Sequence, residues 1–159
     1  MAAQTIITLT TDFGPSSPYV AAMKGVILSI NPDVKLVDIC HSIPPQQVLQ
    51  AAQVLAATTP LFPNEAIHVA VVDPGVGGSR EIVYVEFPWG RYICPDNGLL
   101  GRLAERGQPS MIVTVVEEQF YRSPVAPTFH GRDIMALQGC ILIVVCIRPT
   151  RTARSGFAR

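Results

Sequence analysis

The segment from Ile67 to Arg80, IHVAVVDPGVGGSR, constrains the fold more than any other part of the chain. Its first half is apolar and rich in β-branched residues, which predicts a buried strand. The strand must end at Asp73-Pro74, because a glycine-rich turn follows. Arg80 then leads into a second strand-like run, IVYV. Open α/β sheets place ligands and chemistry beside carboxylates at the carboxyl ends of such strands.

Strand-like and helix-like segments alternate along the 159 residues. Besides the strand at residue 67, we expect strands at residues 6–9, 34–39, 82–85, 92–94 and 111–116, and helices at residues 18–30, 48–57 and 99–106. The first helix has the clearest start, because Ser17 can cap it and Pro18 suits its first turn. The alternation predicts an α/β fold: a mostly parallel, Rossmann-like central sheet with helices on both faces.

Charge and composition exclude several classes of protein. Residues 1–133 carry eight Lys and Arg against twelve Asp and Glu, so this acidic body argues against nucleic acid as a partner. No run reaches the ~18 apolar residues of a membrane span, and no basic leader precedes the first strand, so we expect a cytoplasmic protein. The four cysteines form no C-x-x-C pair and are expected to be buried or free thiols.

The glycines after Asp73 suggest a phosphate-binding loop, but two such interpretations fail. A dinucleotide-binding pattern needs a third glycine where Arg80 stands, and a helix should follow where the sequence predicts a strand. A nucleotide triphosphate loop needs Gly-Lys-Ser or Gly-Lys-Thr, which is absent. The loop therefore requires another explanation.

Single residues leave their roles open. Asp73 and Asn97 both suit ordinary turn chemistry, and Asp73 is equally placed for catalysis. Asp12 could serve the entry to a helix, or its carboxylate could accept hydrogen bonds from the vicinal hydroxyls of a ribose. His130 could be structural, or it could perform acid–base or water-orienting work because histidine titrates near neutrality.

Five motifs taken together resemble one known family. In chain order they are TTDFG at 10–14, HSIPP at 41–45, HVAVVDPGVGGSR at 68–80, PDNGLL at 95–100 and TFHGRD at 128–133. Over roughly residues 5–134 the chain resembles the S-adenosyl-L-methionine (SAM) hydroxide adenosyltransferases, hydrolases that form adenosine. This family is related to the SAM-dependent fluorinases and chlorinases.

The resemblance implies a role for each matching residue. The family's catalytic residues correspond to Asp73, Arg80 and His130. Substrate-binding residues fall on Asp12, which would bind the ribose, and on Phe13, Asn97, Thr128 and Phe129. His41 and His68 carry no such assignment, and we interpret both as structural.

The implied reaction is hydrolysis of SAM to adenosine and L-methionine by in-line attack of an oriented water or hydroxide at C5′. The resemblance implies no metal and no cofactor beyond the SAM substrate, and a homotrimer with sites between adjacent subunits. The halide-using relatives replace the catalytic Asp and His with tyrosines and carry a serine where this chain has Gly131. The water-using branch therefore fits better, with a halide-using adenosyltransferase as the less favoured alternative.

The resemblance also implies a domain division. Residues 1–134 correspond to the family's N-terminal α/β domain, which a β-barrel-like C-terminal domain follows in the family. Residues 135–159 resemble neither that domain nor the expected continuing helix, because they join the apolar run Ile141–Ile147 to an Arg-rich end. We interpret this tail as a truncated or frame-shifted end. An inactive nucleoside-binding or structural fragment is therefore the alternative function.

Overall fold

A computed structural model of the chain describes residues 5–115, 123–126 and 128–139. Its strands form a mixed sheet of six, in the order β2-β1-β3-β5-β4-β6. Their bounds are Ile6–Thr11 (β1), Lys35–Cys40 (β2), Ile67–Val71 (β3), Ile82–Phe87 (β4), Gly90–Pro95 (β5) and Met111–Thr114 (β6). Strand β1 is parallel to β2 and β3, and β3 is parallel to β5, whereas β4 is antiparallel to β5 and β6. Only β4 runs against the others, so the expected mostly parallel α/β sheet is confirmed.

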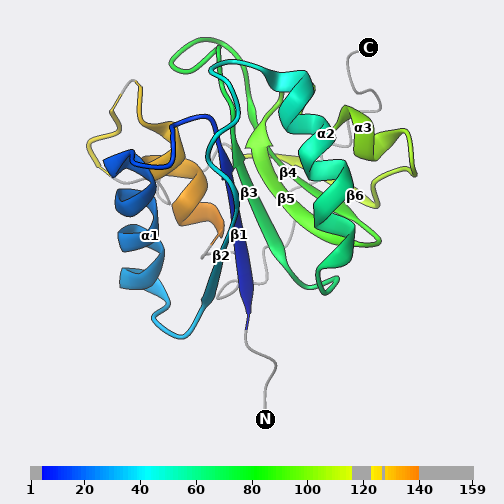
Figure 1. The fold of residues 1–159 in the computed structure, drawn as a ribbon, viewed down its shortest axis with the longest axis horizontal. Helices are drawn as coiled ribbons and strands as arrows, with labels where there is room; N and C mark the ends of the chain where they lie inside the picture. Colours follow the sequence, from blue (N-terminus) through cyan, green and yellow to red (C-terminus); the bar gives the residue numbers. More distant parts are fainter. Residues whose placement is uncertain (1–4, 116–122, 127, 140–159) are drawn as a thin grey trace.

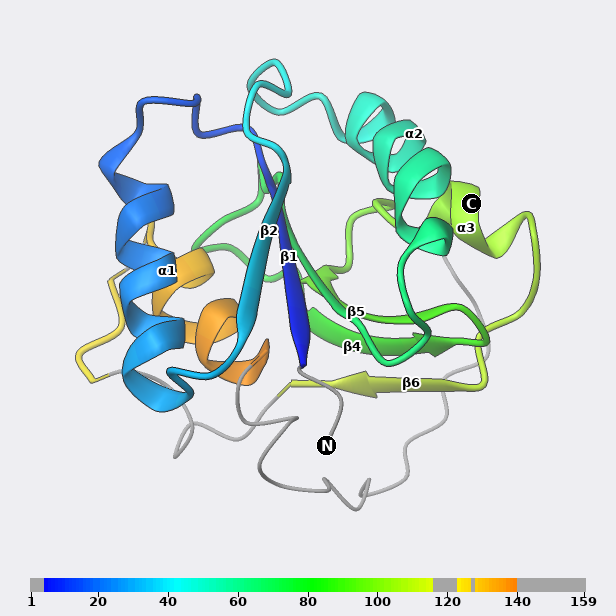
Figure 2. The ribbon, with the colours of Figure 1, turned by 60° about the horizontal axis from the view of Figure 1, so that its bottom comes forward.

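Helices cover both faces of this sheet, as predicted (Figure 1). Their bounds are Pro18–Ile30 (α1), Val48–Thr58 (α2), Thr59–Leu61 (η1, a 3₁₀ turn), Gly101–Ala104 (α3) and Gly131–Met135 (η3, a wide π-type turn). Helical geometry continues from η3 across residues 136–139. Helices α1 and η3 pack together on one face, and α2 and α3 on the other, which the turned view in Figure 2 also shows.

Two apolar cores result, because alternate residues of each strand point to opposite faces. On one face Leu9 of β1 and Val69 of β3 pack with Met23 of α1 and Met135 of η3. The second core is built around Leu55 of α2 and continues through α3. All five residues of β3 are buried, as expected for a central strand covered on both faces.

The start of α1 follows the sequence signal. The side chain of Ser17 accepts a hydrogen bond from the backbone N–H of Tyr19 at 3.2 Å, and Pro18 occupies the first helical position. This cap satisfies one of the amide donors that a helix start leaves unpaired. The predicted N-terminus of the helix is therefore confirmed.

The helix predicted at residues 99–106 is shorter, because α3 holds only Gly101–Ala104. Gly98 adopts a positive φ of 95°, and tight i to i+3 hydrogen bonds flank the single α turn, from Leu103 to Leu100 and from Arg106 to Leu103. Such bonds produce a 3₁₀-like path instead of a longer α-helix.

The loops that follow β1, β2 and β3 gather at one edge of the sheet, the upper edge in Figure 1. Thr11 pairs with Val71 in the parallel register, so the chain leaves β1 and β3 at the same level. This brings Asp12 and Asp73 to the same edge, where open α/β sheets bind ligands. None of the helices in the described part of the chain is long and apolar enough to cross a membrane.

Candidate active site

Asp73 and Arg80 form a buried ion pair across the glycine-rich turn. Arg80 Nε donates to both carboxylate oxygens, at 3.0 and 2.9 Å, and Nη2 donates to Oδ2 at 2.5 Å. The side chain of Asp73 is only 4% exposed and that of Arg80 12%. The turn needs its glycines, because a Cβ at Gly75 would lie 3.0 Å from Arg80 Cγ, and Gly77 has a φ of 76°. Several donors on one carboxylate fix the guanidinium in a single orientation.

His130 extends this pair into a three-residue cluster. Arg80 Nη2 lies 2.8 Å from His130 Nδ1, and because a guanidinium only donates, Nδ1 must accept. Burial lowers the pKa of His130 and the charge of Arg80 lowers it further, while the charges of Asp73 and Asp133 act in the opposite direction. The imidazole is therefore neutral near pH 7, with its proton on Nε2.

Gly131 explains how His130, which lies 50 residues after Arg80 in the sequence, comes into contact with it. A Cβ on Gly131 would lie 3.1 Å from Cγ1 of Val71, the last residue of β3. The missing side chain lets helix η3 begin directly against the strand that leads to Asp73. The structure thus brings together all three residues that were predicted to be catalytic.

Asp12 and Asn97 hold corresponding positions after β1 and β5, the strands that flank β3. Asp12 Oδ2 accepts a hydrogen bond from the backbone N–H of Gln46 at 2.8 Å. Asn97 Nδ2 donates to the carbonyl of Val72 at 2.9 Å, directly before Asp73, and its buried Oδ1 has no hydrogen-bond partner among the described residues. Asn97 thus serves the turn chemistry that the sequence suggested, and its Oδ1 is a buried acceptor without a partner among the described residues.

The predicted substrate-binding aromatic residues meet through a residue that the sequence reasoning did not select. The rings of Phe13 and Phe129 each contact Tyr19 edge-on, with centroids 5.8 and 4.2 Å apart. Arg132 places its guanidinium 4.5 Å from the centre of the Phe129 ring. Thr128 is exposed next to this group. Tyr19 is itself 48% exposed, a large apolar surface where the loop after β1 enters α1.

The two remaining histidines lie in different surroundings. His68 is fully buried under the second core, with Nδ1 2.8 Å from the hydroxyl of Thr8, and burial lowers its pKa to about 4. His41 instead contacts the loop that carries Asp12, through Thr11. Sequence reasoning missed this contact, although the HSIPP motif directly after β2 was a signal for it.

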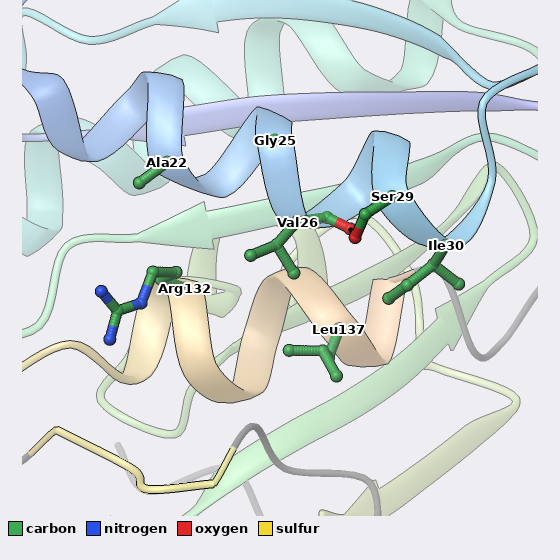
Figure 3. Close-up of a pocket in the computed structure, with 7 residues that line it drawn as sticks. All are labelled: Ala22, Gly25, Val26, Ser29, Ile30, Arg132 and Leu137. Atoms are coloured by element: carbon green, nitrogen blue, oxygen red, sulfur yellow. Dashed lines mark hydrogen bonds between the residues drawn. The ribbon is translucent and has the colours of Figure 1, made fainter.

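A groove between α1 and η3 is lined by none of the three residues Asp73, Arg80 and His130 (Figure 3). Val26 and Leu137 point toward each other across it, with Arg132 at one end and Ile30 at the other. None of the eight predicted site residues lines it. We therefore place the candidate active site at the edge of the sheet and not in this groove.

The cluster can hold a small anion or a polarised water. A fixed guanidinium and a neutral imidazole N–H are both hydrogen-bond donors, and the carboxylate beside them can accept a proton. Among the described residues, no group of three or more His, Cys, Asp or Glu side chains is arranged to hold a metal ion.

Comparison with known proteins agrees with the motifs. Residues 7–145 match the family described as the SAM hydroxide adenosyltransferase N-terminal domain. The chain is 44% identical over 144 residues to the (R)-S-adenosyl-L-methionine hydrolase of Methanocaldococcus jannaschii, covering 87% of this chain and 53% of that protein. A fluorinase of Nocardia brasiliensis is 27% identical over 155 residues, covering 83% and 52%. The chain thus spans about half the length of the curated relatives it matches.

A solved structure gives the same result. The crystal structure of an uncharacterized conserved protein from Thermotoga maritima superposes with a TM-score of 0.82 at 34% identity, covering 87% of this chain and 54% of that one. The resemblance inferred from the five motifs is therefore confirmed, and the chain belongs to the SAM hydroxide adenosyltransferase family, whose N-terminal domain it matches.

Proposed function

We propose that the protein hydrolyses SAM to adenosine and L-methionine. The observation that carries this proposal is the hydrogen-bonded cluster of Asp73, Arg80 and His130 at the ligand-binding edge of the sheet. The relatives at 39–44% identity that are named (R)-S-adenosyl-L-methionine hydrolase support it. Their names also specify the R epimer of the molecule, and we extend that preference to this chain.

The substrate makes modest chemical demands on the protein. Attack of oxygen on C5′ forms one C–O bond while the C5′–S bond breaks, and the electron pair of that bond neutralises the sulfonium. Methionine therefore leaves as an uncharged thioether, without a metal or a cofactor. The protein has to align the nucleophile opposite the C–S bond and exclude competing water.

The cluster suits that task. Arg80 Nη1 makes no hydrogen bond to the described residues, and the Nε2–H of His130 points away from Arg80, so both can donate to the attacking oxygen. His130 can accept a proton at Nδ1 only by giving up the hydrogen bond from Arg80. We therefore assign proton acceptance to the Asp73 carboxylate and orientation of the nucleophile to His130.

The flanking residues supply the substrate contacts in this proposal. Asp12 binds the ribose hydroxyls, Asn97 contributes its unpaired Oδ1, and Phe13, Thr128 and Phe129 form the wall of the pocket. The acidic charge of residues 1–133 suits a cationic sulfonium substrate and disfavours nucleic acid. Following the family, we propose a homotrimer with sites between adjacent subunits.

Incubation of the full chain with each sulfonium epimer of SAM tests the proposal, with adenosine and methionine followed by chromatography. We expect adenosine from the R epimer, and Asp73→Asn, which keeps the shape but removes the charge, should lower kcat about 10²–10³-fold. The hydrolase of Methanocaldococcus jannaschii serves as the positive control. Unchanged SAM under conditions in which that relative is active contradicts the proposal.

Two further measurements separate the alternatives. Calorimetry with adenosine distinguishes an enzyme from an inactive nucleoside-binding fragment, which binds adenosine but forms no product. Addition of fluoride or chloride tests halide use, for which a 5′-halo-5′-deoxyadenosine is the diagnostic product. We expect no such product, because His130 and Gly131 stand where the halide-using relatives carry tyrosine and serine.

A further inference from the structure

Two loops at the edge of the sheet contact each other at three points. The Asp12 loop comprises Thr11, the last residue of β1, and residues 12–14 after it, and the His41 loop comprises residues 41–46 and follows β2. The His41 ring contacts the Thr11 hydroxyl through Nδ1 at 2.9 Å. The carbonyl of His41 accepts from the Gly14 N–H at 2.8 Å, and the N–H of Gln46 donates to Asp12 Oδ2 at 2.8 Å.

These contacts fix Asp12 from both sides and through its own carboxylate. The bonds from His41 reach the residue before Asp12 and the second residue after it, so the backbone that carries the carboxylate cannot rotate freely. Oδ1 of Asp12 accepts no hydrogen bond from the described residues, so it remains available to a ligand. A carboxylate oriented before binding loses less conformational freedom when a ligand arrives.

The conformation of Gln46 supports the same conclusion. Gln46 adopts a φ of 65°, and it is the only residue other than glycine with a positive φ in the described part of the chain. A residue with a side chain is strained in this region, and such strain persists where surrounding contacts require it. Here the strained residue is the one whose N–H binds Asp12.

The His41 ring is held on its far side as well. His41 Nε2 lies 3.1 Å from Asp38 Oδ1, a close contact that falls short of hydrogen-bond geometry. Lys24 Nζ on α1 donates to the other oxygen of Asp38 at 2.6 Å. Burial alone would raise the pKa of Asp38, but the hydrogen bond from Lys24, the close contact of His41 and the charges of both outweigh burial and hold the pKa below its usual value. The carboxylate is therefore ionised near neutrality.

We propose that His41 is a positioning residue for nucleoside binding: its ring, through Thr11, and its backbone carbonyl, through Gly14, set the orientation of Asp12 toward a ribose diol. This rests on the proposed function, because it takes the ribose of SAM or adenosine as the ligand of Asp12. His41 touches neither the nucleophile nor the leaving group in this scheme. Its loss should therefore weaken binding and leave the chemical step unchanged.

Steady-state kinetics with SAM test this through two matched pairs of variants. Thr11→Val removes the hydroxyl while keeping the shape, and Thr11→Ser keeps the hydroxyl. His41→Ala removes the ring, and His41→Asn keeps a polar group near the position of Nδ1. We expect Thr11→Val and His41→Ala to raise KM about tenfold, the effect of losing roughly one hydrogen bond, with kcat within about twofold of the wild-type value. Thr11→Ser and His41→Asn should stay within about threefold of the wild-type KM.

Hydrogen exchange in the free protein supplies a readout that does not depend on catalysis. His41→Ala keeps the acceptors of the Gly14 and Gln46 amides but removes the ring contact to Thr11 that holds the two loops together. These two amides should therefore exchange faster in His41→Ala than in the wild type, while the amide of Val69 in the centre of β3 should be unchanged. Faster exchange at Val69 would indicate general destabilisation and would contradict a local role.

The outcomes distinguish this inference from the proposed function. A wild-type chain that neither turns over SAM nor binds adenosine overturns the proposed function, and Asp12 then has no ribose for His41 to position it toward. Turnover with an unchanged KM in both His41→Ala and Thr11→Val overturns the positioning role alone. A fall in kcat at constant KM also overturns it, because that result would place His41 in the chemical step.

Discussion

His130 and His68 are both buried enough to have lowered pKa values, but they lie in opposite environments. His68 is fully buried in the second core, where its neighbours are the Thr8 hydroxyl and the rings of Phe62 and Tyr92. Burial alone lowers its pKa to about 4. His130 is only partly buried at the edge of the sheet, where the cation of Arg80 and two carboxylates act on its pKa in opposite directions.

The difference shows which histidine can respond to a ligand. No charged group contributes to the shift of His68, so a ligand at the sheet edge leaves its protonation unchanged. The shift of His130 depends on charges that a bound sulfonium or hydroxide would alter. A lowered pKa therefore marks a candidate catalytic group only where charged partners and solvent access accompany it.

The largest expected effect comes from removing the cation beside His130. In Arg80→Met the pKa of His130 should rise, because the charge that lowers it is gone while Asp73 and Asp133 remain. Hydrolysis of SAM should fall about 10³-fold, as for the loss of a donor to the reacting oxygen. Titration of the imidazole signals by nuclear magnetic resonance and measurement of kcat follow the two effects.

Arg91→Met is the matched control, because Arg91 is a half-exposed arginine of β5 whose nearest carboxylate, Glu86, is 3.9 Å away. It should leave both the His130 pKa and kcat unchanged, and the His68 signals should not move in either variant. A His130 pKa that stays constant or falls in Arg80→Met contradicts the electrostatic account.

The next effect concerns the dependence of stability on pH. The folded protein keeps His68 neutral down to about pH 4, whereas the unfolded chain protonates it near its ordinary value of 6.5. The unfolded state thus binds more protons between these values. The stabilisation is complete above pH 6.5 and is lost as the pH falls toward 4, by up to about 3 kcal/mol.

Urea unfolding of the wild type and of His68→Gln between pH 4.5 and 7.5 measures this contribution. The variant lacks the titrating group, so its free energy of unfolding should fall less steeply with acid. His130→Gln is the control and should change the slope less, because His130 is only partly buried. Equal slopes for wild type and His68→Gln would refute the assignment.

The smallest effects test how tightly the surroundings of His68 are packed. A Cβ on Gly90 would lie 2.9 Å from His68 Nε2, so Gly90→Ala should destabilise the fold by about 1–3 kcal/mol. Gly25→Ala is the matched control at an exposed position of α1, where a Cβ meets nothing within 4 Å. It should stabilise the protein by about 0.5–1 kcal/mol, because alanine favours a helix more than glycine does. Thermal unfolding of both variants measures the two changes in stability, which should have opposite signs. A Gly90→Ala variant that is as stable as the wild type contradicts the close packing around His68.

Local signals in the sequence predicted the elements whose causes are themselves local. The Ser17 cap is confirmed because the hydroxyl and the amide that it binds are two residues apart. The strands β4 and β5, both predicted, lie next to each other in the sequence and pair as an antiparallel hairpin across the two residues Pro88 and Trp89. Helix α3 is shorter than predicted, because the sequence around Gly98 favours tight turns. The spacing of apolar residues, on which the prediction rested, does not reveal this preference.

The contacts of the candidate site also fall into those that are local in sequence, which could be predicted, and those that are not. Asp73 and Arg80 are seven residues apart on one turn, so their pairing was foreseeable from the segment itself. His130 joins them from 50 residues away through the approach of Gly131 to Val71, and only the ordered motifs suggested that the three act together. The contact between His41 and Thr11 depends on the parallel register of β1 and β2, which no pattern within either strand specifies.

The strand order also has a consequence for how the site forms during folding. Strands β4 and β5 are joined by a two-residue turn, whereas Ile7 of β1 pairs with Ile67 of β3 across 60 residues of chain. Closing a loop costs about 0.6 kcal/mol more for each doubling of its length, so pairings that are local in sequence form first. The hairpin is therefore expected to form early. Asp12 and Asp73 come to the same edge of the sheet only when β1 docks, which makes assembly of the proposed site one of the last events in folding.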